Sequence, residues 1–301
     1  MKADDFKAVP NQWGFFSAAP LPSAEELSEW YRKKYYQTAD QRQTTYQSSY
    51  NEAELAHKRL MANQLLHAVE LVSGAGGGRS FLDVGCGEGF ALKAAHDRGW
   101  SVEGLDFNAD PARHWNPEIG DRVVAGDAYA LLDQVVASGR QVTACVLTNV
   151  LEHVLDPHHL LTTLRRVVEP GGVLAITVPN DFSALQKALV AEGCVEREYW
   201  FSPPSHLHYF DSASLPRFCA GMGFEVRDLY AGFPVEFFLL HPGSNYARRP
   251  DAGKDVHRAR VTLDLMMADR GMDSFHALYR ALAACDMGRL ITVVLRNGEP
   301  G

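Results

Sequence analysis

The sequence predicts an α/β fold built on a doubly wound parallel sheet, and three observations lead to this prediction. From residue 80 onward, short apolar segments alternate with segments of helical periodicity, as in successive β–α–β units. The apolar segments are nearly continuous, which is typical of strands that helices cover on both faces. The first of them leads into a turn with the spacing G-x-G-x-G at residues 85–89, where glycine lets the backbone approach a ligand closely.

Residues 1–75 are expected to form an N-terminal helical cap segment ahead of the main domain, which spans residues 76–301. The first helix begins at Ser23, with Glu26 three residues later as in a capping box, and a second helix follows over about residues 52–72. The tyrosines of this segment either pack the helices onto the main domain or line a ligand pocket. The tyrosines considered for a pocket are Tyr35, Tyr36, Tyr46 and Tyr50.

Seven segments of the main domain are expected to be strands. They cover residues 81–84, 100–105, 122–124, 142–147, 172–178, 224–230 and 289–296. The segment of about residues 232–287 is too long for a hairpin connection, and two stretches within it have helical periodicity. We therefore expect a helical insertion before the last strand, folded over the functional edge of the sheet.

The composition is that of an ordinary soluble globular protein, with 46% apolar and 22% charged residues. A formal net charge of -8 argues against nucleic acid or an anionic membrane as the main partner. No apolar run approaches the length that spans a bilayer, and the first residues lack the apolar core of a secretion signal. The five cysteines form no C-x-x-C pair, which suits a reducing compartment, so we expect a cytoplasmic protein.

Polar side chains stand at the ends of successive predicted strands. They are Asp83, Asp106, Asp127, Asn149 and Asn180. In an open parallel sheet, ligands bind beyond the carboxyl ends of the strands, where the strand order reverses. Asp106, about 20 residues past the glycine turn, suits hydrogen bonds to ribose hydroxyls, and Asp127 could accept a hydrogen bond from an adenine amino group. Each aspartate alone could be a helix cap, but their joint occurrence favours a nucleoside-bearing ligand.

The glycine turn differs from that of dinucleotide-binding folds, which carry G-x-G-x-x-G. Here the third glycine, Gly89, comes one residue early, and Phe90 follows it. An acidic residue, Glu88, also lies inside the turn, which suits a cationic or zwitterionic ligand better than a pyrophosphate. The spacing therefore disfavours a nicotinamide-dependent dehydrogenase.

Five motifs in order, LDVGCGEG, EGLDFN, AGDA, LTNVLEHVLDP and EPGGVLAITVPN, resemble those of class I S-adenosylmethionine-dependent methyltransferases. The match covers about residues 80–180, and the later stretches HLHYFDSASLPRFCAGMGFEV and RLITVVL resemble the end of that fold. The resemblance implies a Rossmann-like, seven-stranded sheet whose last strand is antiparallel to the rest. It also implies S-adenosyl-L-methionine as the cofactor.

The resemblance assigns cofactor roles to particular residues. Asp83 and the backbone of the glycine turn would hold the methionine portion, Asp106 the ribose, and Asp127 with Ala128 the adenine. Asn149 and Leu151 would flank the sulfonium end. The complete set of expected cofactor-binding residues is Asp83, Gly85, Cys86, Gly87, Gly89, Asp106, Phe107, Asp127, Ala128, Asn149 and Leu151.

Three histidines are candidates for the base that removes a proton from the methyl acceptor, because histidine is the natural base near neutral pH. They are His153, in LEHV, and the pair His206 and His208, in SPPSHLHYF. If their segment is extended, His206 and His208 lie on one face, because side chains two residues apart do so in a strand. Each histidine could instead support or cap the pocket structurally.

The stretch NVLEHV also resembles EVLEHV of the ubiquinone-biosynthesis O-methyltransferases, where carboxylates and histidine can hold a divalent cation. Asn149 replaces the first acid here, which lowers the charge of any such site. We therefore expect no bound metal and a packing role for Glu152 and His153.

The predicted function is methyl transfer from S-adenosylmethionine to a small-molecule or glycan acceptor, preferably at oxygen. An NPPY signature, expected of many amino-methylating relatives, is absent after the fourth strand, where TNVL stands instead. Methylation at nitrogen or carbon, and a binding protein without catalysis, are the alternatives. Neither the acceptor nor the oligomeric state is specified by the sequence.

Overall fold

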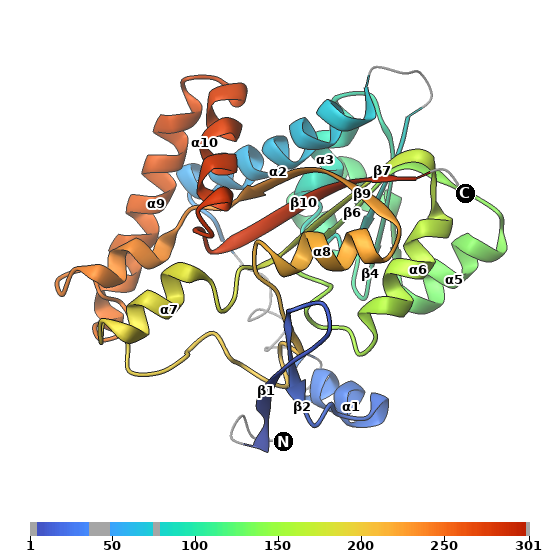
Figure 1. Ribbon diagram of the computed structural model, residues 1–301. Coiled ribbons are helices and arrows are strands. Elements are labelled where there is room, and N and C mark those ends of the chain that lie inside the picture. Colours follow the sequence, from blue (N-terminus) through green and yellow to red (C-terminus); the bar gives the residue numbers. More distant parts are fainter. Residues whose placement is uncertain (1–4, 36–48, 75–78, 299–301) are drawn as a thin grey trace.

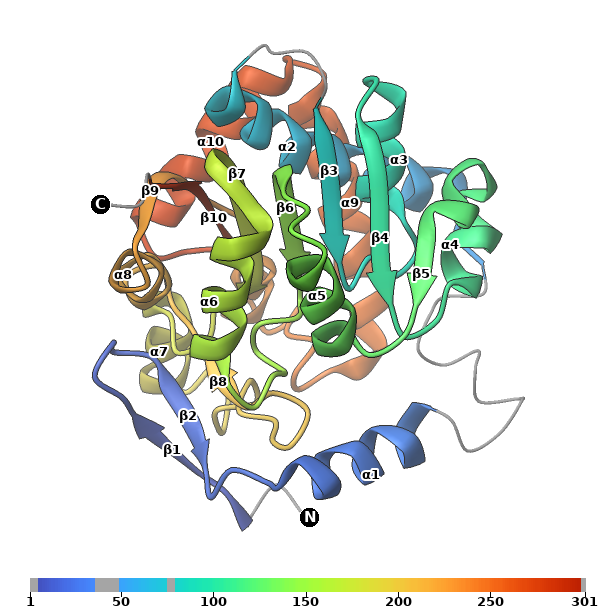
Figure 2. The same ribbon diagram turned by 90° about the vertical axis from the view of Figure 1, so that its right-hand side faces the viewer.

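A computed structural model describes residues 5–35, 49–74 and 79–298. Its centre is a seven-stranded sheet in the order β5-β4-β3-β6-β7-β10-β9, with helices on both faces (Figures 1 and 2). The strands are β3 (Ser80–Val84), β4 (Ser101–Asp106), β5 (Val123–Ala125), β6 (Val142–Thr148), β7 (Val168–Pro179), β9 (Phe224–Ala231) and β10 (Leu290–Asn297).

The pairing of the strands confirms the predicted fold class. Strands β5, β4, β3, β6 and β7 pair in parallel, whereas β10 lies antiparallel to both of its neighbours, β7 and β9. The chain runs from β3 outward to β5 and then returns to place β6 on the other side of β3. The strand order therefore reverses between β3 and β6, which is where open α/β sheets bind ligands.

Two apolar layers cover the sheet. The helices of this fold are α2 (Glu52–Ser73), α3 (Phe90–Asp97), α4 (Asp110–Trp115), α5 (Ala128–Ala137), α6 (Pro157–Val167), α7 (Ala184–Ala191), α8 (Ser214–Gly221), α9 (Gly253–Ala268) and α10 (Met272–Ala284). Leu82 and Leu147 face the layer formed by α5, α6 and α8, while Phe81 and Val146 face the layer of α2, α3 and α10. Alternate strand residues thus enter opposite cores, as the pleat requires.

Polar side chains cap the N-termini of several helices and fix the residue at which each helix begins. At each cap a side-chain oxygen accepts a hydrogen bond from a backbone N–H of the first helical turn, which otherwise has no partner within the helix. The capping residues are Asn51 for α2, Asp127 for α5, Asp156 for α6 and Ser183 for α7.

The N-terminal part begins with a β-hairpin that the sequence did not predict. Strands β1 (Lys7–Pro10) and β2 (Phe16–Ala19) pair with each other, and β2 also pairs with the short strand β8 (His208–Tyr209). Helix α1 (Ala24–Tyr35) follows with the predicted capping box, in which the Glu26 N–H donates to Ser23 Oγ at 3.1 Å. Tyr36 and Tyr46 lie outside the described residues, as does the side chain of Tyr35.

The insertion before the last strand contains the short 3-10 helices η4 (Val235–Leu240) and η5 (Pro250–Ala252), followed by α9 and α10. Its two ends lie at the carboxyl edge, where Glu236 Oε1 lies 3.8 Å from Arg289 Nε and Asp286 accepts hydrogen bonds from the Ala184 N–H and the Ser212 hydroxyl. Helices α9 and α10 instead pack against α2 and β9 (Figure 1). The expectation that the insertion folds over the functional edge therefore describes η4 but not the two long helices.

Two buried histidine–aspartate pairs join the insertion to the sheet and to α2. His57 Nε2 of α2 lies 2.7 Å from Asp264 Oδ2 of α9, and His276 Nε2 of α10 lies 2.6 Å from Asp228 Oδ2 of β9. The hydroxyl of Tyr279 also donates to Asp264. The insertion is thus tied into the core by buried polar contacts as well as by apolar packing. No helix in the described ranges is long and apolar enough to cross a bilayer.

Candidate active site

The glycine turn after β3 has the backbone conformation that its composition predicts. Gly85, Gly87 and Gly89 have φ values of 76°, 52° and 77°, a left-handed region that L side chains rarely adopt. A Cβ on Gly85 would lie 2.5 Å from Val150 Cγ2, and one on Gly89 would lie 2.7 Å from Ile119 Cδ1. A Cβ at Gly85 or Gly89 would therefore clash, and the backbone of the turn stands at the switch point, ahead of the N-terminus of α3.

Asp83, the last acidic residue before the turn, fits a ligand that brings hydrogen-bond donors. Its side chain is buried, and Oδ1 has no hydrogen-bond partner among the described residues. Burial, and secondarily the nearby Asp106, raise the pKa of this carboxyl to about 8. A buried acceptor without a partner is costly, so the site suits a donor-bearing group such as the ammonium of an amino acid.

Asp106 closes β4 and holds the turn at the same time. Its Oδ2 accepts a hydrogen bond of 2.8 Å from the Gly87 N–H, and Oδ1 accepts one of 3.1 Å from the Asn108 N–H. Each carboxylate oxygen can accept more than one hydrogen bond, so these contacts are compatible with the expected ribose contact. Phe107 follows with its side chain largely in solvent, at 62% exposure, where it can cover the apolar face of a ligand.

The remaining expected cofactor residues lie along the same edge. Asp127 Oδ1 accepts a 3.0 Å hydrogen bond from the Ala130 N–H, so this aspartate is also the cap of α5, and Ala128 is the first residue of that helix. Asn149 follows β6 with a φ of 55°. Leu151 is fully buried in the core, and burial raises the pKa of the Cys86 thiol well above its usual range. Leu151 and Cys86 could therefore offer a ligand little besides their backbone.

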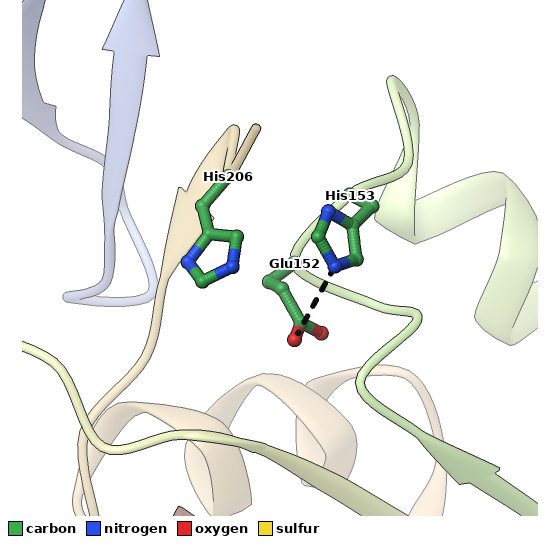
Figure 3. Close-up of side chains that lie close together, drawn as sticks. All are labelled: Glu152, His153 and His206. Atoms are coloured by element: carbon green, nitrogen blue, oxygen red, sulfur yellow. Dashed lines mark ion pairs between the residues drawn. The ribbon is translucent and has the colours of Figure 1, made fainter. Parts of the chain in front are cut away.

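An acidic side chain and two histidines converge beyond the carboxyl end of β6. Figure 3 shows Glu152 and His153 on the loop after β6, facing His206 from the segment before β8. One ligand atom from each of the three residues lies within 4.8 Å of the others. The two histidine rings meet edge to face, with centroids 4.9 Å apart. The loops are held together because the Glu152 carbonyl accepts hydrogen bonds from the N–H groups of Leu207 and His208.

The protonation states in this cluster follow from its contacts. His153 Nδ1 donates to the Ser205 carbonyl at 2.5 Å, so the neutral ring carries its lone pair on Nε2, 3.7 Å from Glu152 Oε1. Glu152 is 1% exposed, and neither carboxyl oxygen has a hydrogen-bond partner among the described residues. Burial is the main cause that raises the pKa of Glu152 to about 8, and Arg289 acts in the opposite direction.

A second pair of charges borders the cluster. His206 Nδ1 lies 3.9 Å from Asp181 Oδ2, and Asp181 Oδ1 accepts a 2.7 Å hydrogen bond from Arg289 Nη1. Asp181 and Arg289 were missed as site residues by the sequence analysis, which also weighed Glu152 only for packing or metal binding. The only sequence signal for Asp181 is its place directly after Asn180 at the end of β7.

His208 has different surroundings from His206, although the two are only two residues apart. Its Nδ1 lies 2.9 Å from Ser17 Oγ of β2, and its ring packs edge to face on Phe15. The side chain is buried, which lowers the pKa of His208 to about 4. The structure thus groups His206 with His153 and Glu152, and packs His208 under the N-terminal hairpin.

Comparisons with known proteins identify the family to which the chain belongs. The family described as methyltransferase domain matches residues 50–229. A probable S-adenosylmethionine-dependent methyltransferase of Mycolicibacterium smegmatis is 26% identical over 181 residues, which cover 56% of this chain and 62% of that protein. The ubiquinone biosynthesis O-methyltransferase of Caulobacter sp. (strain K31) is 30% identical over 171 residues, which cover 53% and 64%. The chain thus spans less than two thirds of the length of these curated relatives.

Among solved structures, an S-adenosylmethionine-dependent methyltransferase from Archaeoglobus fulgidus is 16% identical, with a TM-score of 0.49, 82% of this chain covered and 100% of that chain. The family match extends on both sides of the five motifs between residues 80 and 180, so it confirms the resemblance that these motifs indicated. The chain belongs to the methyltransferase domain family.

Proposed function

We propose that this chain transfers the methyl group of S-adenosylmethionine to an oxygen atom of a small-molecule or glycan acceptor. The observation that carries the proposal is the cluster of Glu152, His153 and His206 at the carboxyl edge of the sheet, near the switch point. Methylation of a hydroxyl requires a proton acceptor close to the reacting oxygen, and this cluster supplies one. Methylation at nitrogen or carbon, and cofactor binding without catalysis, are the alternatives.

The residues that would hold the cofactor are Asp83, the backbone of the glycine turn, Asp106 with Phe107, and Asp127 with Ala128. When bound, S-adenosylmethionine supplies an electrophilic methyl group on a positively charged sulfur. The fit rests on the buried Asp83 Oδ1, which has no hydrogen-bond partner among the described residues, and on Gly85 and Gly89, where a Cβ would clash with a neighbouring side chain.

The proton of the acceptor hydroxyl would pass to Nε2 of His153. The Ser205 carbonyl keeps the other proton on Nδ1, so this ring presents Nε2 as its basic atom. The positive charge that then develops on the ring would be stabilised by Glu152, whose Oε1 lies 3.7 Å away, once that carboxyl is ionised. His206 packs on His153 and would orient it or accept the proton itself.

The same ligand atoms could instead hold a divalent cation, because they lie within 4.8 Å of one another. We favour proton transfer, since Asn149 replaces the additional acid of the ubiquinone-type motif. Methyl transfer should then persist in EDTA. Loss of transfer in EDTA with recovery in Mn²⁺ would assign the cluster to a metal.

The acidic net charge of -8 supports a small acceptor rather than nucleic acid. A cytoplasmic location is likewise proposed, on the basis of the scattered cysteines.

The decisive experiment has two stages. Calorimetric titration with S-adenosylhomocysteine, with NAD as the contrast, tests the cofactor, and transfer of a radiolabelled methyl group to a metabolite extract and a glycan panel tests catalysis. Binding of NAD alone would refute the proposal. Binding of S-adenosylhomocysteine without transfer to any acceptor would favour the non-catalytic alternative.

A further inference from the structure

Glu88, between the second and third glycines of the turn, is paired within the protein. Its Oε1 accepts a 2.5 Å hydrogen bond from the Tyr50 hydroxyl, and its Oε2 accepts one of 2.8 Å from Lys58 Nζ. Glu88 is buried. The sequence suggested that its charge favours a cationic ligand, but the structure places a cation of the chain itself on this carboxylate. Glu88 therefore has a different task.

The partners of Glu88 come from the start of α2 and are themselves fixed. The Tyr50 ring packs against Trp115, with centroids 4.7 Å apart, and Lys58 Nζ lies over the rings of Tyr50 and Phe90 at 5.1 and 5.8 Å. On the other side, Asn116 Nδ2 donates a 2.7 Å hydrogen bond to the Glu88 carbonyl. The turn is thus held from two directions by elements outside the β3–α3 unit.

We propose that Tyr50, Lys58 and Glu88 form a clasp that fixes the glycine turn in the conformation that receives the cofactor. The inference rests on the proposed function, and it makes these three side chains positioning residues that set cofactor affinity through the backbone. Gly87 and Gly89 flank Glu88 and have no side chains of their own to hold them. Glycine also has the largest conformational freedom to lose, so an unclasped turn must be ordered by the ligand at a cost in affinity.

The clasp also acts on a residue expected to contact the cofactor. The N–H of Gly87, directly before Glu88, donates to Asp106 Oδ2 at 2.8 Å. A displacement of Glu88 therefore moves the backbone group that orients the Asp106 carboxylate. This path connects the start of α2 to the ribose end of the expected site.

The test is the affinity for S-adenosylhomocysteine, measured by isothermal titration calorimetry on the full chain. Lys58→Met and Glu88→Gln should each raise the Kd about tenfold, which is about 1.4 kcal/mol. Lys58→Arg keeps the cation and should bind within about twofold of the unmodified protein. The double variant should bind no more weakly than the single ones, because both changes break the same contact. Lys93→Met is the matched control, since Lys93 Nζ pairs with Asp97 at 2.6 Å on the neighbouring helix α3.

A purely structural role gives a different result. If Lys58→Met and Glu88→Gln lower the melting temperature of the ligand-free protein but leave the Kd within twofold, the clasp is refuted. Additive losses in the double variant would also refute it, because they would show two independent effects. If the unmodified protein does not bind S-adenosylhomocysteine at all, the proposed function fails first.

Discussion

The proposed site has two halves. The cofactor half comprises the glycine turn and the aspartates at the strand ends, and the acceptor half comprises Glu152, His153 and His206 with the neighbouring Asp181 and Arg289. The two halves differ in how far apart in the chain their residues lie. In the cofactor half, the hydrogen bond between Gly87 and Asp106 joins residues 19 positions apart. In the proposed acceptor half, His153 contacts a carbonyl 52 positions away, and Arg289 contacts Asp181 across 108 positions. A site built from successive strand ends leaves a compact motif in the sequence. A site built where distant loops meet leaves only isolated residues.

The two halves also differ in their proposed roles, which are cofactor binding and proton transfer. The cofactor half consists of backbone held in a left-handed turn, with carboxylates at the ends of β3, β4 and β5. The proposed acceptor half consists of titratable side chains around the buried Glu152, and burial raises the pKa of that carboxyl to about 8. Substitutions in the two halves should therefore affect different measurements.

The largest effect is expected from the two clustered histidines. His153→Ala and His206→Ala should lower kcat by about 10²–10⁴-fold, the range for loss of a general base, with little change in affinity for S-adenosylhomocysteine. His208→Ala is the matched comparison: its side chain lies under the hairpin, so turnover should stay near that of the unmodified protein. Single-turnover transfer assays with the three variants check this. Equal turnover in all three would remove the acceptor half as a source of base catalysis.

Asp106→Ala should act on the cofactor half alone. The expected loss is about 1–3 kcal/mol of binding free energy for S-adenosylhomocysteine, the scale for removing a charged hydrogen-bond partner. Part of this loss would come from the Gly87 N–H, which gives up its acceptor. Calorimetry at fixed pH measures it, with Asp127→Ala as a second cofactor-half variant. An unchanged Kd would contradict the ribose role of Asp106.

The pH dependence of turnover should follow the ionisation of the Glu152 carboxyl. Because ionised Glu152 stabilises a protonated His153 and its pKa is raised to about 8, kcat/KM should rise up to tenfold per pH unit below pH 8 and level off above it. Glu152→Gln should remove this rise and lower the plateau. Profiles between pH 6 and pH 9.5 for both proteins give the comparison. A profile that is unchanged in the variant would assign the ionisation to another group.

The smallest expected effect is on stability in the absence of ligand. Asp83 has a pKa of about 8 in the folded protein instead of 3.8, so the folded state holds an extra proton between these values. The free energy of unfolding should therefore fall as pH rises through this window. Asp83→Asn should flatten that fall, whose slope is at most about 1.4 kcal/mol per pH unit. Denaturant melts at pH 5 and pH 8 measure it. A steeper fall in the variant would contradict the assignment.

The contrast between the halves also explains how well the sequence predicted each. The seven strands and the antiparallel β10 followed from ordered motifs, and the left-handed conformation of Gly85, Gly87 and Gly89 followed from the backbone that such a turn needs. The hairpin of β1 and β2 was missed because its strands are short and its third partner, β8, is distant in the chain. No residue pattern near Glu88 predicts its pairing with Lys58 either, because this contact depends on where α2 passes the glycine turn.

The same reason applies to the choice among the histidines. Periodicity placed His206 and His208 on one face, but only β8 is extended, and His206 precedes it. The deciding contacts come from Ser17 on one side and His153 on the other. Neither contact can be inferred from the spacing of the two histidines.

The buried histidine–aspartate pairs of α9 and α10 limit which parts of this chain can be removed or exchanged. Deleting residues 232–287 would remove the partners of His57 and Asp228 and would also uncover the faces of α2 and β9 against which α9 and α10 pack. Both the polar contacts and the apolar packing would then be lost. Residues 232–287 therefore cannot be removed or exchanged without a loss of stability. Substitutions in the N-terminal hairpin and in α7 leave both pairs intact.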